Sequence, residues 1–194
     1  MLDALLGGGW PRGALSELLG RRSSGRTSVM LAALARAARA GEATALVDTG
    51  GALDPRAAVA CGVPLPRLLW IRCAPEQALK AADLVVSAGG FDVLALDLGD
   101  ERPRVPTAAW VRLKHGSERQ GTSVLVATPA RAVGAFAAAA VDQQAAVPSF
   151  FGGGPPLLDG ARVKIVCLRR ASRSANDTGE PQAPCASVAF TCRS

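Results

Sequence analysis

Short apolar runs alternate with stretches of helical composition through the first two thirds of the chain. The apolar runs predict buried strands at residues 14–19, 43–48, 68–72, 91–98 and 122–127. The stretches between them predict helices at residues 27–40, 55–61, 76–88 and 106–118. Continuous apolar runs are typical of strands that are covered on both faces. Strands that alternate with helices over short connections therefore predict an α/β fold with a mostly parallel central sheet flanked by helices.

The last third of the chain is less regular. Residues 132–144 are rich in alanine, and their pattern leaves helix and strand both open. Residues 150–160 (FFGGGPPLLDG) predict a loop, because glycine and proline dominate their centre. Residues 161–168 and 186–192 predict two further strands. The segment 171–184 between them, rich in Ser, Asn, Gly and Pro, predicts a flexible hairpin connection.

Composition narrows the class of protein. A length of 194 residues suits one domain over residues 1–194. Five cysteines without C-x-x-C spacing and a single histidine argue against a zinc site or a disulfide framework. The longest apolar run, 132–141, is too short to cross a membrane. We therefore expect a cytoplasmic protein with reduced thiols.

The net charge of +6 is concentrated towards the end of the chain. Residues 161–194 contain six basic and two acidic side chains. This basic C-terminal part is interpreted either as a surface for nucleic acid or an acidic protein, or as a solvated arginine-rich rim. The chain has no tyrosine and few other aromatic residues, so platforms for stacking single-stranded bases are scarce.

Residues 20–27 (GRRSSGRT) have the glycine frame of a phosphate-binding loop, G-x-x-x-x-G-K-[ST], with Arg26 in place of the lysine. Such a loop places backbone N–H groups around phosphate at a helix N-terminus. Asp97 ends a later apolar run and fits the acid that holds Mg²⁺ in these proteins, with the Thr27 hydroxyl as a second ligand if a magnesium nucleotide binds. The planar, forked guanidinium of arginine is larger than an ammonium and fits such a closed loop poorly.

Several longer motifs resemble the ATPase core of the bacterial RecA family. LDALLGGGWPRGALSELLG at 2–20 resembles the segment that leads into that family's phosphate loop. VDTGGALDP at 47–55 is similar to the family's DAEHALDP, and EQALKAADLVVSAGGFDVLALD at 76–97 continues the similarity in register. ARVKIV at 161–166 resembles a late strand of the family. The resemblance covers most of residues 2–131 and implies a RecA-like P-loop fold.

Departures from the family pattern fall on its catalytic positions. The glutamate that activates water in RecA corresponds to Gly50, which cannot accept a proton. The loop lysine corresponds to Arg26, the γ-phosphate-sensing glutamine to Pro129, and the aromatic that stacks on adenine to Ala57, whereas the adenine contact is retained as Asp54. The resemblance therefore implies a pseudo-ATPase with no catalytic residue and no required cofactor, and residual binding of Mg-ATP or ADP stays open. The degenerate nucleotide site is expected to comprise Gly20, Ser23, Ser24, Gly25, Arg26, Thr27, Asp54 and Asp97.

A short RecA-like chain without catalytic machinery resembles the ImuA family of bacterial mutagenesis accessory proteins. That resemblance implies a role in the SOS response and translesion synthesis, through protein–protein contacts with an ImuB-like protein and RecA. Weak or no direct DNA binding is expected, because the segments after Asp97 and after Arg131 are short or weakly charged where RecA has its DNA loops. The candidate contact residues for a partner or DNA are Trp10, Phe150, Phe151, Arg169, Arg170 and Arg173.

Alternatives remain at this stage. One is an ATP-binding, RecA-type DNA repair ATPase with an unidentified base, for which Asp48 is the preferred candidate. A second is a cell-division inhibitor of the SulA type, which shares the degenerate core. A third is a nucleic-acid-binding module that uses the arginine-rich tail. Trp10 beside Pro11 fits a core position as well as a contact site.

Overall fold

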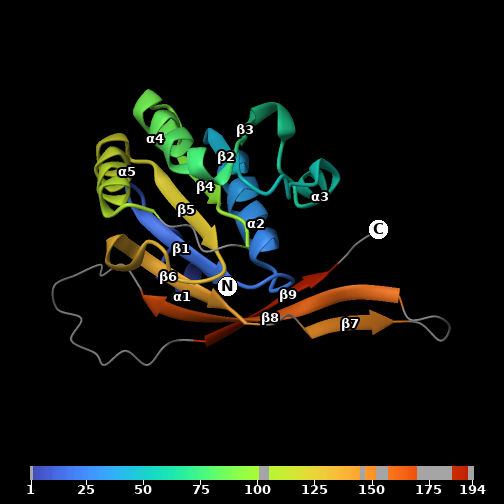
Figure 1. The fold of residues 1–194 in the computed structure, drawn as a ribbon. Coiled ribbons are helices and arrows are strands. Elements are labelled where there is room, and N and C mark those ends of the chain that lie inside the picture. Colours follow the sequence, from blue (N-terminus) through green and yellow to red (C-terminus); the bar gives the residue numbers. More distant parts are fainter. Residues whose placement is uncertain (1, 101–104, 145–146, 152–156, 170–184, 192–194) are drawn as a thin grey trace.

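The computed structural model describes residues 2–100, 105–144, 147–151, 157–169 and 185–191. They form one central sheet with helices on both faces (Figure 1). The strands run in the order β3-β2-β4-β5-β1-β6-β8-β7, and β9 pairs with β8. The predicted α/β fold with a mostly parallel sheet is confirmed.

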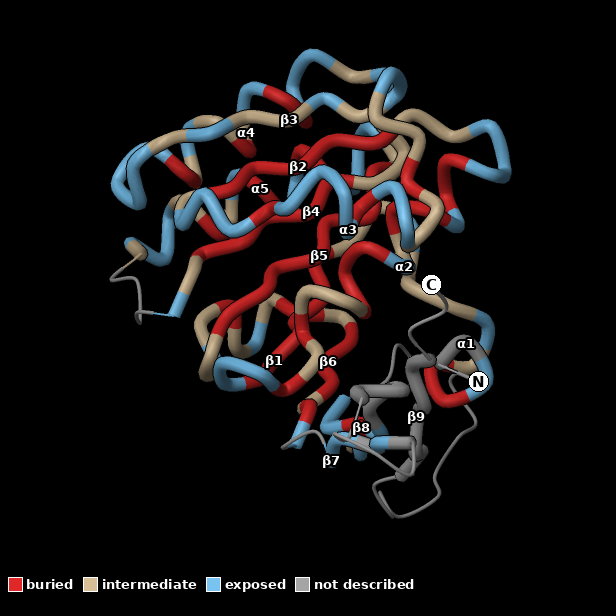
Figure 2. The backbone as a smooth tube through the Cα atoms, turned by 90° about the vertical axis from the view of Figure 1, so that its right-hand side faces the viewer, coloured by how far each residue is buried: buried red, intermediate tan, exposed pale blue. Residues whose placement is uncertain are grey.

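The parallel part of the sheet carries the first six strands. It consists of β1 (Leu15–Gly20), β2 (Thr44–Asp48), β3 (Leu68–Arg72), β4 (Val93–Asp97), β5 (Ser123–Thr128) and β6 (Ala137–Gln143). Most residues of the central strands are buried on both faces (Figure 2). This burial explains why these strands are continuous apolar runs in the sequence.

Helices cover both faces of the sheet, and each face has its own hydrophobic core cluster. They are α1 (Leu2–Leu5), α2 (Arg26–Arg39), α3 (Pro55–Ala60), α4 (Ala78–Ala88) and α5 (Thr107–Gln120), with single 3₁₀ turns at Leu65–Arg67, Pro75–Gln77 and Gly134–Phe136. One core cluster packs α2 against the sheet through side chains such as Leu34 and Leu18. The other packs α4 and α5 against the opposite face, through side chains such as Val86 and Leu113. Within the described residues, no helix is both long enough and apolar enough to cross a membrane.

An antiparallel extension continues the sheet beyond β6. It consists of β7 (Val147–Phe151), β8 (Leu157–Arg169) and β9 (Cys185–Thr191). The C-terminal half of β8 pairs with β6 and its N-terminal part pairs with β7. Val163, Ile165 and Cys167 of β8 are buried in the same core cluster as α2. The extension is therefore part of the domain's core at one end and projects from it at the other (Figure 1).

Two expectations for the last third need correction or resolution. The predicted loop at 150–160 is wrong at both ends, because Phe150 and Phe151 end β7 and Leu157 begins β8. The glycines and prolines at 152–156 predicted a loop, and this prediction was extended too far into the strands on either side. The ambiguous segment 132–144 forms a 3₁₀ turn followed by strand β6. The predicted hairpin connection at 171–184 lies outside the described residues.

Candidate functional site

The loop that joins β1 to α2 has the backbone of a phosphate-binding loop. It lies at the carboxyl ends of the parallel strands, where ligands bind in open α/β sheets. Gly25 is the N-cap of α2 with φ 87°, a left-handed conformation that favours glycine, and Ser23 has φ 60°. A Cβ on Gly20 would lie 2.2 Å from the Ser24 hydroxyl oxygen. The left-handed φ favours glycine at position 25, and a side chain at position 20 would have to push the Ser24 hydroxyl aside, whatever the loop binds.

The Arg26 side chain turns back towards the start of this loop. Its Nη1 donates to the Gly20 carbonyl oxygen at 2.8 Å, and its Nη2 donates to the Gly99 carbonyl oxygen at 3.0 Å. Nη2 also lies 3.3 Å from Oδ1 of Asp100 and 3.6 Å from Oδ1 of Asp97. The side chain is only 8% exposed. The guanidinium thus joins the start of the loop to the turn that follows β4.

The groups around this guanidinium are hydrogen-bond acceptors and carboxylates. Asp97 is buried, and its Oδ1 accepts the Gly99 N–H at 2.9 Å. Arg26 already supplies a cation beside Asp97, and the binding of Mg²⁺ by Thr27 and Asp97 together with a nucleotide stays a prediction. Among the described residues, no cluster of three His, Cys, Asp or Glu side chains is arranged to hold a metal ion.

Burial has a larger effect on the pKa of Asp97 than its hydrogen bond and ion pair do. Desolvation raises the pKa of Asp97, and the nearby carboxylates of Asp48 and Asp100 raise it further. The Gly99 N–H and the Arg26 guanidinium oppose this by lowering the pKa, but the net shift is upwards. The native protein therefore takes up a proton at Asp97 more readily than the unfolded chain does.

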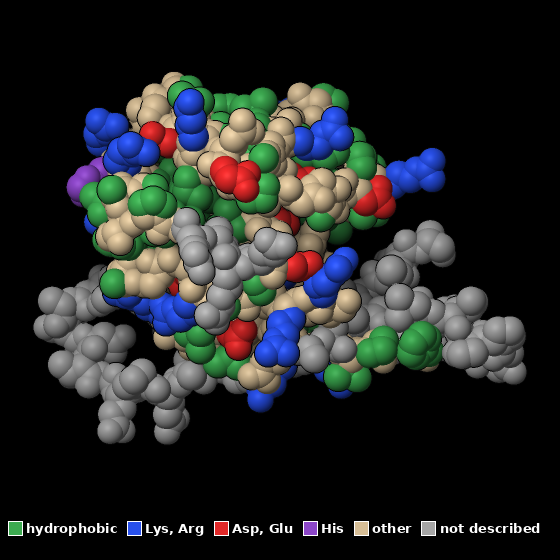
Figure 3. All heavy atoms as spheres, viewed as in Figure 1, with side chains coloured by type: hydrophobic (Ala, Val, Ile, Leu, Met, Phe, Trp, Pro, Cys, Tyr) green, Lys and Arg blue, Asp and Glu red, His purple; other side chains and the backbone are tan. Residues whose placement is uncertain are grey.

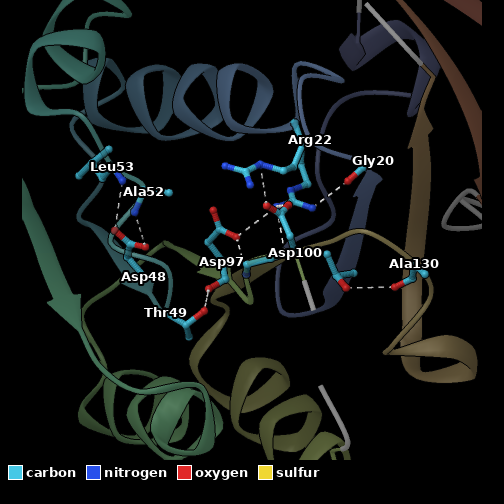
Figure 4. Close-up of polar contacts among 12 residues, drawn as sticks. Gly20, Arg22, Asp48, Thr49, Ala52, Leu53, Asp97, Asp100 and Ala130 are labelled. Carbon is cyan, nitrogen blue, oxygen red and sulfur yellow. Dashed lines mark hydrogen bonds and ion pairs between the residues drawn. The ribbon is translucent and has the colours of Figure 1, made fainter. Parts of the chain in front are cut away.

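The other carboxylate near this edge of the sheet, Asp48, is held by a different set of donors. Its Oδ1 accepts the Ala52 N–H at 3.1 Å, and its Oδ2 accepts the Leu53 N–H at 3.2 Å and the Trp70 Nε1–H at 3.3 Å. These bonds turn the carboxylate towards the 49–53 turn (Figure 4). Asp48 shapes that turn, and its role as a general base stays a prediction.

The predicted adenine contact, Asp54, and the three positions that depart from the family pattern share no described contact with Arg26. Asp54 is exposed and caps α3, where its Oδ1 accepts the Arg56 N–H at 2.8 Å. Ala57 is exposed on the same helix, and Pro129 is half-buried in the turn after β5. Gly50 is exposed, and a Cβ built on it would meet only the Ala52 Cβ, at 3.9 Å. Space for a larger side chain at position 50 is therefore present.

A buried glutamate on β1 was missed by the sequence interpretation. Glu17 is fully buried, and its Oε1 accepts the N–H groups of Ala132 and Val133 at 2.7 Å each. Its Oε2 forms an ion pair with Nε of Arg131 at 3.3 Å. The signal was a lone acid in the apolar run LSELLG. Glu17 fixes the segment after β5, which in the resemblance corresponds to the start of the second DNA loop.

The candidate contact residues are found in different environments. Trp10 is partly buried and packs against the core cluster of α2, which favours its interpretation as a core residue. Phe150 is 56% exposed on β7. Arg169 is exposed and donates to the Ala135 carbonyl oxygen at 3.2 Å. The side chain of Phe151, and residues Arg170 and Arg173, lie outside the part of the chain that is described.

A glycine-framed loop between the first strand and a helix, with an acid at the end of another parallel strand, defines the P-loop class of α/β proteins. Residues 1–104 match the family model of the RecA N-terminal domain, which is more than half of the chain. The chain belongs to this family.

Curated relatives support this membership over the same region. The chain is 45% identical over 98 residues to Protein RecA of Corynebacterium jeikeium, and 47% identical over 98 residues to Protein RecA of Salinispora arenicola. Each match covers 50% of this chain but only 26% and 28% of the relatives. The chain thus spans about a quarter of the length of these relatives. The crystal structure of the RadB recombinase has the same fold, with a TM-score of 0.68 at 17% identity, covering 89% of this chain and 88% of that one.

Replacing Asp97 with asparagine tests whether burial outweighs the Gly99 hydrogen bond and the Arg26 ion pair in setting the pKa of Asp97. Since the native pKa of Asp97 is raised, the stability from its protonated form is complete below the unfolded-state pKa and is lost as pH rises through the native pKa. Asp97→Asn mimics the protonated form, so we expect it to unfold at an equal or higher urea concentration than the wild type at pH 7.5. The difference should shrink as the pH approaches 4.

Asp83→Asn makes the same charge change on α4 and controls for the altered net charge. The free energies of unfolding of the wild type, Asp97→Asn and Asp83→Asn are measured by urea denaturation at several pH values. An Asp97→Asn protein that is less stable at pH 7.5 by more than about 1.4 kcal/mol, the equivalent of one pKa unit, would contradict this balance.

Replacing Glu17 with alanine should destabilise the protein by about 3–5 kcal/mol, the usual cost of removing one partner of a buried charged network. The N–H groups of Ala132 and Val133 would lose their acceptor. Glu17→Gln keeps an oxygen that can accept hydrogen bonds from these N–H groups, so this variant should lose less stability. Urea denaturation at pH 7 compares the two variants, and equal losses would show that the acceptor oxygen is unimportant.

Proposed function

We propose that this RecA-family protein does not hydrolyse ATP and acts through protein–protein contacts in the bacterial DNA damage response. The process is SOS translesion mutagenesis, and the partners are an ImuB-like protein and RecA. The observation that carries the proposal is the Arg26 guanidinium, held by the Gly20 and Gly99 carbonyl oxygens inside the loop.

The site opposes ATP turnover in two ways. A bound nucleotide would have to displace the guanidinium from two backbone acceptors before its phosphates entered the loop. Hydrolysis further needs a positioned base and a metal ion that bridges the phosphates. The family's base corresponds to Gly50, and the Asp97 carboxylate already lies beside the Arg26 cation.

The segment after β5 supports contacts with protein over direct binding to DNA. Glu17 holds the backbone of Ala132 and Val133, and the chain then passes through one 3₁₀ turn into β6. The described residues leave little room there for a mobile, basic DNA loop. This favours weak or no direct DNA binding.

The projecting part of the sheet offers a surface for a partner. Val147 is 67% exposed and Phe150 is 56% exposed on β7. Figure 3 shows hydrophobic side chains on the projecting part of the molecule. Arg162, which pairs with Val147 across the strands, and Lys164 are exposed on β8. Exposed apolar side chains beside cations are typical of a protein-binding surface.

An ATP-binding, RecA-type DNA repair ATPase is the second candidate. The retained glycine frame and the buried Asp97 at the end of β4 favour it. A SulA-like cell-division inhibitor is a third candidate that would also act through contacts, and the partner experiment below separates it from the leading proposal.

Arg26→Lys tests whether the arginine closes the nucleotide site. We expect the wild type to bind fluorescent ATP and ADP with Mg²⁺ only weakly, and to show no ATP turnover. Lysine cannot reproduce the planar fork that bonds both carbonyl oxygens, so the loop should become available and binding should increase by about tenfold or more, still without turnover. Equilibrium fluorescence binding and a phosphate-release assay on the same samples measure this. Steady hydrolysis by the wild type that is lost in Asp97→Ala would favour the ATPase instead.

The partner surface is tested by Phe150→Ser. We expect it to weaken binding to purified ImuB-like protein or RecA by about tenfold, because an exposed aromatic anchor carries much of the energy of such interfaces. Leu84→Ser, at a 63% exposed position on α4, is the matched control and should bind normally. Biolayer interferometry measures both variants. Normal binding by Phe150→Ser would contradict the surface, and absence of binding to either partner would contradict the proposed function.

A further inference from the structure

Strand β8 has one face in the core and the other face in solvent. Val163, Ile165 and Cys167 are buried in the core cluster of α2, so alternation along the strand places the residues between them on the opposite face. On that opposite face Arg162 and Lys164 are exposed. No described residue of β7 or β8 belongs to the core cluster of α4 and α5. Within the described part of the chain, the core that α4 and α5 form with the sheet therefore stops short of β8.

Two apolar residues border these cations on the same face. Val147 of β7 pairs with Arg162 across the strands, and Val166 lies two positions beyond Lys164 on β8. Val147 is exposed and Val166 is half-buried. We call these four residues the cationic face. Phe150 comes three positions after Val147, so alternation along β7 turns it to the other side of the ribbon.

The two cations of this face lack a counter-charge within the described chain. Other basic side chains, such as Arg12 and Arg131, pair with carboxylates of the same chain. Arg162 and Lys164 form no ion pair with any described residue. One acidic residue shares the face, because Asp142 of β6 is half-buried at its inner end. The face thus keeps a net positive charge and complements an acidic partner.

The free edge beside this face is poorly suited to pairing with a partner's strand. β7 is the last strand in the order of the sheet, so its outer edge is unpaired within the described residues. Pro148, the second residue of β7, has no N–H group to donate to an added strand. Proline in an edge strand is one of the features that prevent edge-to-edge pairing. A partner segment is therefore expected to lie across the face rather than along the edge.

The spacing of the two cations fits an acidic helix. Arg162 and Lys164 are two positions apart on an extended strand, so their Cα atoms are separated by roughly 6–7 Å. Side chains at positions i and i+4 of a helix lie one turn apart on the same face, at a spacing of about 6 Å. One helix can therefore place an acidic residue against each cation. An apolar residue one further turn along would lie over Val166, which follows Lys164 at the same spacing on β8.

We propose that the cationic face binds an amphipathic helical segment of a partner protein, with acidic residues at i and i+4 and an apolar residue one turn further on. The two carboxylates pair with Arg162 and Lys164, and the apolar side chain packs against Val166. The inference deepens the proposed function, because it rests on the protein acting through protein–protein contacts. It adds the chemistry of the partner's segment and places its site on the side of the ribbon opposite Phe150.

Two synthetic helical peptides are the probes. One carries Glu at i and i+4 and Leu one turn further on, and the other has Gln at both acidic positions. Titration into isotope-labelled protein at low salt, followed by NMR, measures the affinities and locates the shifted amide signals. We expect the Glu peptide to shift signals of β7 and β8, and the Gln peptide to bind roughly five- to tenfold more weakly, because two exposed ion pairs are lost. The difference should shrink as salt rises. Equal affinities of the two peptides would overturn the proposal.

Two double variants locate the site. Arg162→Gln combined with Lys164→Gln should bind the Glu peptide as weakly as the wild type binds the Gln peptide. Lys80→Gln combined with Arg119→Gln removes two cations from α4 and α5 and should bind as the wild type does. All four side chains are exposed, so both variants should fold, and their thermal unfolding is recorded alongside. An equal loss of affinity in both double variants would show a general charge effect and contradict the site.

A single-stranded oligonucleotide of dT tests the other class of acidic ligand. We expect the wild type to bind it more weakly than the Glu peptide. Tighter binding of the oligonucleotide that is lost in the Arg162→Gln and Lys164→Gln variant would assign the cationic face to nucleic acid and overturn the proposal.

The outcome for the cationic face is separable from that for the proposed function. Peptide binding needs no ImuB-like protein and no RecA. Binding of the Glu peptide to the face, with no binding of either partner protein, would overturn the proposed function and support the face. Partner binding that is unchanged by Arg162→Gln and Lys164→Gln, with equal affinities of the two peptides, would leave the proposed function standing and overturn the face.

Discussion

The buried guanidinium of Arg26 connects three segments at the carboxyl edge of the parallel sheet. Arg26 is the group through which the end of β1, the start of α2 and the turn after β4 contact one another. A buried charge is tolerated only where it is paired and hydrogen-bonded, and here two carbonyl oxygens and two carboxylates meet that condition. The planar fork of arginine reaches acceptors on two separate segments at once, which a lysine ammonium does less well. Arg26 thus joins the loop to the turn after β4, together with the ion pair between Arg22 and Asp100.

Because Arg26 occupies the loop, the loop's glycines have a structural role that needs no bound anion. In a phosphate-binding loop they let the backbone approach an anion, and the anion completes the structure. In this chain the left-handed φ of Gly25 favours glycine, and a Cβ on Gly20 would push the Ser24 hydroxyl aside. These constraints persist whether or not a nucleotide binds. A chain can thus retain the family's loop while the chemistry at Arg26 and Gly50 departs from it.

The sequence predicted the parallel part of the fold because its signals are local. Apolar runs marked β1 to β5, Pro55 after Asp54 marked the start of α3, and strand ends placed Asp97 beside the loop. The direction of Arg26 was not predictable, since its acceptor at Gly99 lies 73 residues away. The same holds for Glu17, which bonds residues 115 and 116 positions further on. The alanine-rich β6 fits two periodicities equally well, so only its pairing with β1 decides that it is a strand.

Strand β6 joins the closed site to the exposed surface. Its last residue, Gln143, pairs with Gly20 at the start of the loop, and its Cβ lies 3.3 Å from the position of a Cβ on Gly20. β7 begins at Val147, four positions later, and carries the exposed apolar side chains. The same strand therefore bounds both the loop that contains Arg26 and the edge that carries the exposed apolar side chains. Under the proposed function, Arg26 holds the loop from within the chain, so the presentation of this edge to a partner needs no nucleotide.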